Sequence, residues 1–396
     1  MRRRLLPTLL LLALGERLLK HLAVVRFFQR PAPPAPAGAR PLVSIVQPIL
    51  SGDPTLATSL AASLRFRSSY PREWLWLVDE DDAEGRRVCA RLLAEHPQAE
   101  VRLLLVPPPA PTENPKTAKL IVGARVAHGA ILCVLDDDTR LPDDALEQCL
   151  PYLDLPGVGL AFGLPYYVSF DGLWSALVSS FVNSNSLLTY VPAAMLAAPT
   201  TINGMFYALR RDVLEGLGGF GGLEGIAADD FAVAQRLRAG GYRLAQTPLR
   251  HAISTTVTGP GHYWRLMQRW LIFPRESLMR HLPPVELARF YGVALLPLFA
   301  PWLACGATRW GDGATRGLGV AYLAYSSALI AHLNAAYLAG ATPPRWAWLG
   351  PLVQLTLPAQ ALSAALAPRR INWRGHQIEI APGGALRMVR RRSTGV

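Results

Sequence analysis

The sequence predicts an α/β fold, in which a Rossmann-like, mostly parallel open sheet is followed by C-terminal transmembrane or interfacial helices. Between residues 42 and 250, short apolar runs alternate with helical stretches, a pattern that gives a parallel sheet covered on both faces. After residue 285 the chain has three long segments almost without charge. Apolar residues make up 51% of the chain and charged residues 17%, which is low in charge for a soluble domain.

The charge balance narrows the class of partner. A net charge of +12 suits nucleic acid, anionic lipid or a polyanionic small substrate. The chain has no nucleic-acid-binding motif, and its basic residues flank apolar segments, so we expect a membrane and no nucleic acid as partner. The four cysteines show no metal-ligand spacing and are expected to be buried thiols rather than a disulfide framework. They are Cys89, Cys133, Cys149 and Cys305.

The first 30 residues predict an N-terminal membrane anchor. Basic residues are followed by an apolar run from Leu5 to Leu14, which is shorter than the roughly 20 residues of a spanning helix. No small-residue cleavage site of a signal peptide follows. We expect a partly inserted anchor helix, with a true span as the alternative. Residues 31–41 are a Pro/Ala linker that should be extended and solvated.

Residues 42–280 are predicted to form the sheet domain. Its early strands are the apolar runs VSIV (43–46), WLWLV (74–78), VRLLLV (101–106) and ILCVL (131–135). The helices expected between them are Ala57–Leu64, Gly85–Glu95 and Thr117–Ala127. Ligands of such sheets bind outside the carboxyl ends of the strands, so the residues that follow each strand are the candidates for chemistry.

Residues 285–367 are predicted to be membrane helices. Phe290–Gly306, Gly317–Ala341 and Trp346–Ala367 are apolar, and three such segments in succession leave no polar face for water, which disfavours buried helices of a soluble domain. The tail, residues 368–396, is rich in arginine and should stay on the cytoplasmic side. Because the first and third segments contain internal prolines, we expect two full crossings and one re-entrant or interfacial segment.

Three consecutive acids, Asp136, Asp137 and Asp138, directly follow the strand predicted at 131–135. Adjacent carboxylates repel each other, and a divalent cation relieves that repulsion. Mg²⁺ and Mn²⁺ prefer hard oxygen ligands and bridge carboxylates to phosphates. Asp136 and Asp138 are two residues apart, so one peptide presents both to a cation and a nucleotide diphosphate. A solvated acidic turn is the alternative, and the place after a buried strand favours the Mg²⁺ or Mn²⁺ site.

Two further acidic groups lie at related positions. Asp79, Glu80, Asp81 and Asp82 follow the strand predicted at 74–78, on the same edge of the sheet, where hydrogen bonds from a ribose or base are expected.

The pair Asp229 and Asp230 follows a Gly-rich stretch and precedes the predicted helix FAVAQRLRAGG. Carboxylates there either cap the helix or act as a general base toward an acceptor hydroxyl.

Basic and aromatic residues complete the candidate site. Lys116 precedes the helix predicted at 117–127 and would neutralise a diphosphate, although a lone lysine is as often a solvated charge. Arg269 and Trp270 follow the stretch GPGHYWRLM. Arginine can hold a departing diphosphate and tryptophan can form the wall of an acceptor site. A location at the membrane interface is the alternative for both residues.

Taken in this order, the motifs resemble family 2 glycosyltransferases with the GT-A fold, and most closely the ceramide glucosyltransferases. The resemblance covers residues 42–275 and, weakly, the tail. Asp138 and Asp230 are 92 residues apart (230 − 138), and Asp230 and Trp270 are 40 apart (270 − 230), as expected in that family. The motifs are VSIVQPILSGDPTL, ENPKTAKL, CVLDDDTRL, FGLPYYV, NGMFYALRRDVLEGLGGF, IAADDFAVAQRLRAGGYRLA and INWRGHQIEIAPGG.

The resemblance implies a role for each matching residue. The family's first aspartate matches Asp82, with Asp79 a close second, and its metal motif matches Asp136 and Asp138. Its catalytic base matches Asp230. The remaining expected site residues are Pro48, Lys116, Gly204 and Asp229 for the donor nucleotide sugar, and Arg269 and Trp270 for the family's last motif.

The sequence also departs from the family pattern. The last motif begins with Leu266, where the family has glutamine or arginine, although Arg265 is adjacent. The stretch 169–202 lacks the histidine and the Arg-Tyr pair of the ceramide enzymes. Bacterial relatives that glycosylate hopanoids are similar at the same motifs, so the identity of the lipid stays open.

The resemblance therefore implies an inverting, metal-dependent hexosyltransferase that moves a sugar from a UDP-sugar donor, foremost UDP-glucose, to the hydroxyl of a membrane lipid acceptor such as ceramide. Transfer of N-acetylglucosamine to a hopanoid or another bacterial lipid is one alternative. A processive polysaccharide synthase and a non-catalytic membrane scaffold are the others. The expected location is a bacterial inner membrane, as an integral membrane protein whose catalytic domain is cytoplasmic.

Overall fold

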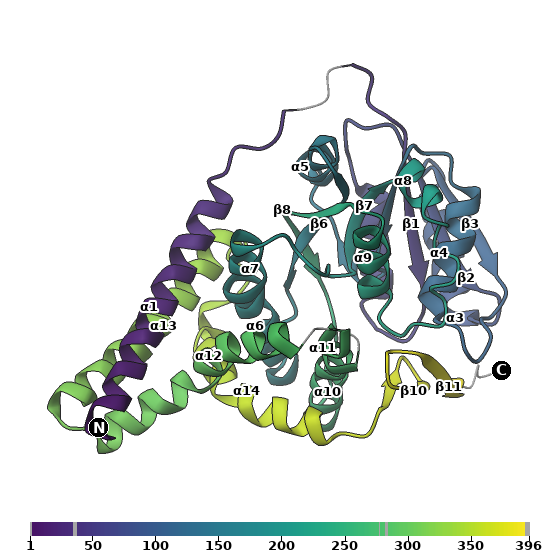
Figure 1. Ribbon diagram of the computed structural model, residues 1–396. Helices are drawn as coiled ribbons and strands as arrows, with labels where there is room; N and C mark the ends of the chain where they lie inside the picture. The colour runs from purple at the N-terminus through teal and green to yellow at the C-terminus, as the bar shows by residue number, and fades with distance from the viewer. Residues whose placement is uncertain (1, 35–37, 277, 282–283, 393–396) are drawn as a thin grey trace. The chain divides into compact units, whose positions relative to one another are not determined.

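The computed structural model describes residues 2–34, 38–276, 278–281 and 284–392, and the chain folds into two compact units (Figure 1). The sheet unit consists of Pro31–Pro165, Ala197–Thr256 and Pro368–Val396. The helical unit consists of Met1–Arg30, Tyr166–Leu196 and Val257–Ala367. Each unit is therefore built from three separate stretches of the chain.

The sheet unit contains an eight-stranded sheet with the strand order β3-β2-β1-β4-β7-β6-β8-β5. Strands β3, β2, β1 and β4 are parallel neighbours, whereas β7 is antiparallel to β4 and to β6. This arrangement confirms the predicted α/β fold. The strands are β1 Val43–Ile49, β2 Arg72–Asp79, β3 Val101–Val106, β4 Ile131–Leu135, β5 Thr139–Arg140, β6 Val158–Tyr167, β7 Phe206–Arg210 and β8 Arg243–Ile253.

Both faces of the sheet are buried, which explains why its central strands are continuous apolar runs. Every residue of β1 is buried; Val46 packs into one hydrophobic cluster and Ile45 into a second, because side chains alternate across a strand. The helices of this unit are α2 Leu56–Arg65, α3 Ala83–Glu95, α4 Pro115–Val126, α5 Ala145–Cys149, the 3₁₀ helix Leu150–Asp154, α8 Arg211–Gly216 and α9 Asp229–Ala239. The four early strands and three helices expected from the sequence are all present.

Close packing of small residues and the buried charge of Arg17 both contribute to the helical unit. Leu10 and Ala13 of α1 pack against Ala300 and Ala304 of α12. Arg17 is 1% exposed and donates hydrogen bonds to the Tyr322 hydroxyl and to Gln354. The elements are α1 Arg2–Phe28, α6 Leu173–Asn185, the π-helix Ser186–Tyr190, α7 Val191–Leu196, α10 Pro260–Glu276, α11 Leu278–His281, α12 Pro284–Trp310, α13 Gly313–Tyr337, the 3₁₀ helix Pro344–Trp346 and α14 Leu349–Leu366.

Two helical segments among the described residues are long and apolar enough to cross a membrane, by length and composition. They are Gly313–Tyr337, with 25 residues, and Pro344–Leu366, with 23. The first apolar segment, with its internal prolines, lies within α12. The N-terminal segment forms one helix of 27 residues, much longer than its apolar run.

The C-terminal residues form a separate three-stranded antiparallel sheet in the order β11-β10-β9. Its strands are β9 Arg370–Trp373, β10 His376–Ile380 and β11 Leu386–Arg390. An isolated bridge joins Ile226 to Ala385, so this tail sheet, which belongs to the sheet unit, is attached to the loop that leads into α9.

We expect Gly123→Ala to destabilise the sheet unit. A Cβ atom at Gly123 would lie 2.5 Å from Cγ1 of Val46 in the buried strand β1, and overpacking of this kind costs about 1–3 kcal/mol. Thermal melting of the purified protein measures the effect. Gly216→Ala in α8 is the matched control, because no heavy atom lies within 4 Å of its new methyl group. Equal melting temperatures for the two variants would contradict the proposed packing of α4 on β1.

Candidate active site

The pairing of β4 with β7 places the first aspartate of the DDD motif beside Gly204. Leu135, the last residue of β4, is opposite Phe206 in the antiparallel register, and the Asp136 amide donates to the Met205 carbonyl at 2.9 Å. Asp136 therefore leaves the sheet at a carboxyl end, next to the Met205–Gly204 peptide. This is the edge at which open α/β sheets bind their ligands.

Lys116 reaches the same place from the start of α4. Asn114 caps this helix, since its side chain accepts a hydrogen bond from the Lys116 amide at 2.9 Å, and Pro115 occupies the first helical position, where the missing N–H is not needed. The Asn114 side chain also donates to the carbonyls of Ile226 and Ala227. One buried asparagine thus fixes both the Lys116 backbone and the loop that precedes Asp229.

The ammonium group of Lys116 joins three parts of the site. Its Nζ lies 2.7 Å from Oδ1 of Asp136 and 3.1 Å from Oδ2 of Asp229, and it donates to the Gly204 carbonyl at 2.9 Å. The Lys116 side chain is 12% exposed. Although burial alone would lower the pKa of Lys116, the charges of Asp136 and Asp229 raise it well above its ordinary value, so the residue stays a cation.

Asp229 and Asp230 begin helix α9. Gly204 packs directly against Asp230: a Cβ atom at Gly204 would lie 2.9 Å from Cβ of Asp230, so a side chain at position 204 would displace this carboxylate. Oδ1 of Asp230 accepts a hydrogen bond from the Phe231 amide at 2.7 Å. The structure therefore brings together five of the expected site residues, Lys116, Asp136, Gly204, Asp229 and Asp230.

The carboxyl groups of Asp136, Asp138 and Asp230 are difficult to ionise. Burial, opposed by Lys116 and reinforced by the charge of Asp138, raises the pKa of Asp136 to about 7. Burial and the charge of Asp137 raise the pKa of Asp138 to about 6. Burial and the charge of Asp229 raise the pKa of Asp230 to about 6. Perturbed carboxylates grouped at a sheet edge are typical of functional sites.

Asp136 and Asp138 fit a divalent cation by their chemistry. Mg²⁺ is usually held by one or two carboxylates together with substrate phosphates and water. The raised pKa values of both groups reflect burial and the charge of neighbouring acids, and a bound cation would offset both effects. Among the described residues no group of three or more His, Cys, Asp or Glu side chains is arranged to hold a metal ion.

The other two expected nucleotide-binding acids are held by the protein itself. Asp79, at the end of β2, lies 2.6 Å from Nζ of Lys119, and its Oδ1 has no hydrogen-bond partner among the described residues. Asp82 caps α3 and accepts hydrogen bonds from the amide and hydroxyl groups of Ser51. Pro48 is buried within β1. Contact of these residues with a nucleoside stays a prediction.

Arg269 and Trp270 belong to helix α10 of the helical unit. The Trp270 ring stacks on Phe181 with a centroid distance of 6.2 Å and meets Tyr167 edge-on at 5.9 Å. Both partners lie in the segment Tyr166–Leu196 of the helical unit. The tryptophan is therefore part of an aromatic cluster on that segment.

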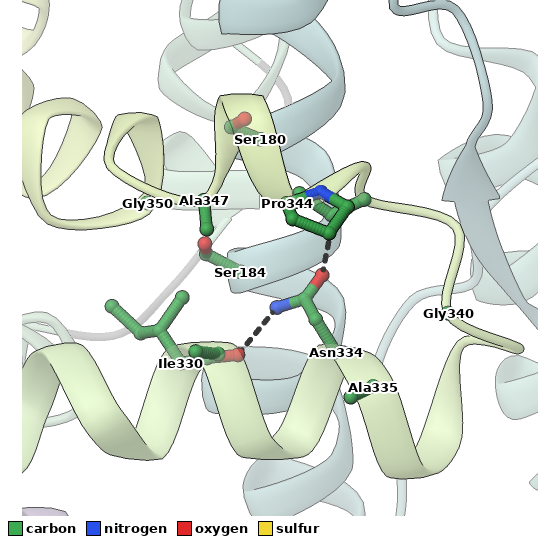
Figure 2. Close-up of a pocket in the computed structure, with 11 residues that line it drawn as sticks. Ser180, Ser184, Ile330, Asn334, Ala335, Gly340, Pro344, Ala347 and Gly350 are labelled. Atoms are coloured by element: carbon green, nitrogen blue, oxygen red, sulfur yellow. Dashed lines mark hydrogen bonds between the residues drawn. The ribbon is translucent and has the colours of Figure 1, made fainter.

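The helical unit also contains a cavity of about 200 Å³ whose lining is mostly apolar (Figure 2). The hydroxyl groups of Ser180 and Ser184 are buried there without hydrogen-bond partners among the described residues. Asn334 donates to the Ile330 carbonyl at 2.8 Å and accepts from Thr342. In this apolar bundle the cavity offers hydrogen-bonding partners to a small polar group.

Comparison with known proteins identifies the class of protein. The family model described as glycosyl transferase family 21 matches residues 5–386, which is nearly the full chain.

The chain belongs to glycosyl transferase family 21.

The chain is also similar to a solved structure, the mannosyltransferase PcManGT from Pyrobaculum calidifontis in complex with GDP-Man and Mn²⁺. The two sequences are 21% identical, and the match covers 92% of this chain and 99% of the other, with a TM-score of 0.49.

Three residues of this glycosyltransferase site were missed by the sequence analysis. Asn114 was visible in the sequence as a helix cap before proline. The Tyr207 hydroxyl, buried without a hydrogen-bond partner in the described part of the chain, interacts electrostatically with Lys116. Arg374 of the tail pairs with Asp137 at 2.6 Å. A tyrosine in a strand and an arginine 237 residues beyond its partner carry no local signal of these contacts.

We expect the stability of the metal-free protein to depend on Asp138 with a defined sign. The folded protein raises the pKa of this carboxyl group from 3.8 to about 6, so its stabilising contribution is present below about pH 4 and lost as the pH rises through about 6. Asp138→Asn should therefore gain stability relative to the wild type between about pH 4.5 and about pH 7.5. Thermal melts in EDTA measure the difference.

Asp212→Asn is the control for this measurement. A hydrogen bond from Arg210 lowers the pKa of Asp212, so this variant should gain nothing as the pH rises. If the melting-temperature difference between Asp138→Asn and the wild type is the same at about pH 4.5 and at about pH 7.5, the prediction is contradicted.

Proposed function

We propose that this glycosyltransferase moves a hexose from a UDP-sugar, foremost UDP-glucose, to the hydroxyl group of a membrane lipid such as ceramide, with inversion at the anomeric carbon and with Mg²⁺ or Mn²⁺. The observation that carries the proposal is the cluster around Lys116. Its ammonium group joins Asp136, Asp229 and Gly204, next to Asp230. Carboxylates that could hold a divalent cation therefore lie next to a carboxylate that could act as a general base. Both roles are needed to transfer a sugar from a nucleotide donor.

In this proposal Asp136 and Asp138 hold the cation, which when bound neutralises the developing charge of the nucleoside diphosphate leaving group. Lys116 orients Asp136 and adds a second positive charge toward the diphosphate. Asp79 and Asp82 assist with the nucleoside, and Pro48 and Gly204 border the donor. Arg269 and Trp270 steady the diphosphate and the acceptor.

Asp230 is proposed as the general base. A lipid hydroxyl is a weak nucleophile, and a carboxylate that takes its proton during attack accelerates the transfer. The pKa of Asp230, raised to about 6 by burial and by the charge of Asp229, makes it a stronger base than an ordinary aspartate while leaving it largely ionised at neutral pH. Its proximity to Gly204 keeps it at the edge where the donor is expected.

The helical unit supports a lipid acceptor and an integral membrane location. Its described residues include two helical segments suited to crossing a membrane, and apolar side chains are exposed on α1, α12 and α14. Such faces are typical of proteins that contact a membrane. Examples are Leu11, Leu12, Leu19, Trp302, Leu362 and Leu366. With the tail on the cytoplasmic side, the catalytic residues would act at the cytoplasmic surface.

Sugar transfer by the purified full-length protein in detergent tests this function. UDP-glucose, UDP-N-acetylglucosamine and UDP-galactose are offered with Mn²⁺ or Mg²⁺ against ceramide, diacylglycerol and hopanoid acceptors. We expect transfer from UDP-glucose to ceramide that EDTA abolishes. Asp230→Asn should lower kcat by about 10²- to 10⁴-fold, because the general base is lost, while UDP binding persists.

Asp212→Asn is the matched control, because it makes the same isosteric change at an exposed helix terminus, where the Asp212 side chain is 66% exposed. It should transfer at the wild-type rate. Transfer of a different sugar or to a different lipid would correct the substrate. Full activity of Asp230→Asn would remove the proposed base, and failure to bind UDP with either metal would reject the function.

A further inference from the structure

The tail sheet is joined to the loop that carries the paired aspartates. The Ala227 amide donates to the Gly384 carbonyl at 2.9 Å, and the Leu386 amide donates to the Gly225 carbonyl at 2.8 Å. These bonds extend the tail sheet onto residues 225–227, two residues before Asp229. The conformation of the α9 entry loop therefore depends on residues close to the C-terminus.

Arg374 occupies an unusual place in the tail. It is the first residue of a two-residue turn, because Trp373 and His376 are paired directly on either side. Its φ is +46° and that of Gly375 is +89°, which is the pattern of a type I′ hairpin turn. Asparagine, aspartate or glycine is favoured at the first position, and an ordinary side chain there costs about 1–2 kcal/mol. Such strain persists where the surrounding structure requires the residue.

The guanidinium group of Arg374 forms a two-pronged ion pair with the middle residue of the DDD motif. Nη1 lies 2.6 Å from Oδ2 of Asp137, and Nη2 lies 2.7 Å from Oδ1. Nη2 is also 3.7 Å from Oδ2 of Asp138, and Nη1 donates to the Leu50 carbonyl. The Asp137 side chain is 6% exposed, so this pair is largely removed from water.

Both oxygens of Asp137 are consequently occupied, since Oδ2 also accepts a hydrogen bond from the Leu50 amide at 2.8 Å. A second tail arginine makes a parallel connection: Nη2 of Arg392 lies 2.6 Å from Oδ1 of Asp82, and Nη1 donates to the Ser51 carbonyl at 2.8 Å. The two arginines thus attach the tail to the backbone of residues 50–51 and to the carboxylates of Asp137 and Asp82.

We propose that Arg374 is a positioning residue of the donor site. Its ion pair occupies the Asp137 carboxylate, so that Asp136 and Asp138 are the carboxylates of the motif that remain available to bind the cation. The tail sheet is then a required component of the nucleotide-sugar site rather than a peripheral extension. This inference rests on the proposed function, because it assigns the cation to the same motif.

Arg374→Asn separates this role from a purely structural one. Asparagine is favoured at this turn position, so the turn itself should be kept. Because Asp137 is left buried without its partner, the melting temperature should fall, and binding is compared at a temperature at which the variant is folded. The loss of the guanidinium group frees Asp137 to compete for the cation. We expect the Kd of UDP in the presence of Mn²⁺, measured by calorimetry, to rise at least about tenfold, a change of about 1.4 kcal/mol.

Two additional variants test the route through Asp137. Arg374→Lys keeps the charge but loses the two-pronged geometry, and its Kd should be intermediate. The double variant Asp137→Asn/Arg374→Asn no longer has the Asp137 carboxylate that would compete for the cation. It should therefore bind UDP with Mn²⁺ more tightly than Arg374→Asn alone. The ability of Ca²⁺ to replace Mn²⁺ should increase only in Arg374→Asn, because Ca²⁺ accepts more oxygen ligands.

Arg370→Asn is the control, since it removes an exposed positive charge from the same tail sheet and should bind UDP as the wild type does. Wild-type binding by Arg374→Asn would overturn the inference while leaving the proposed function standing. A double variant no better than Arg374→Asn would overturn the route through Asp137. Failure of the wild-type protein to bind UDP with Mn²⁺ would reject the proposed function and this inference with it.

Discussion

The candidate site depends on one buried ammonium group that holds several carboxylates at a sheet edge. Lys116 contacts Asp136, which follows β4, and Asp229, which begins α9. Burial makes ionised carboxylates unfavourable, and the pKa values of Asp136, Asp138 and Asp230 are raised accordingly. A lysine that stays charged in this position keeps the cluster from being purely repulsive. The site is thus arranged to receive additional positive charge.

Glycine and asparagine make this concentration of charge sterically and conformationally feasible. Gly204 is needed because the Asp230 side chain packs directly against its Cα, and Asn114 is needed because it both caps α4 and holds the loop before α9. Neither residue has reactive chemistry. Each one fixes the separation between elements that are far apart along the chain, so both are important to the geometry of the charged residues.

The tail contributes a second positively charged side chain to the same site. A hairpin turn brings Arg374 to Asp137, and the tail sheet that contains this turn is hydrogen-bonded to the loop before Asp229. The middle acid of the motif is thereby satisfied by the protein, while its two neighbours remain partly exposed. The three acids of this motif therefore differ in their environment, and so in what they can bind.

Sequence alone determined the α/β class, the four early strands with their helices, and the three acidic groups, because hydrophobic periodicity and a motif's position after a strand are local properties. The family resemblance was confirmed at the level of the glycosyltransferase family. Tertiary structure decided which acids form ion pairs with Lys116. It also decided that Asp82 binds Ser51 and Arg392, and that Arg374 pairs with Asp137. These contacts join residues up to 310 positions apart (392 − 82). They arise from sheet register, helix capping and docking of the tail, which no local pattern encodes.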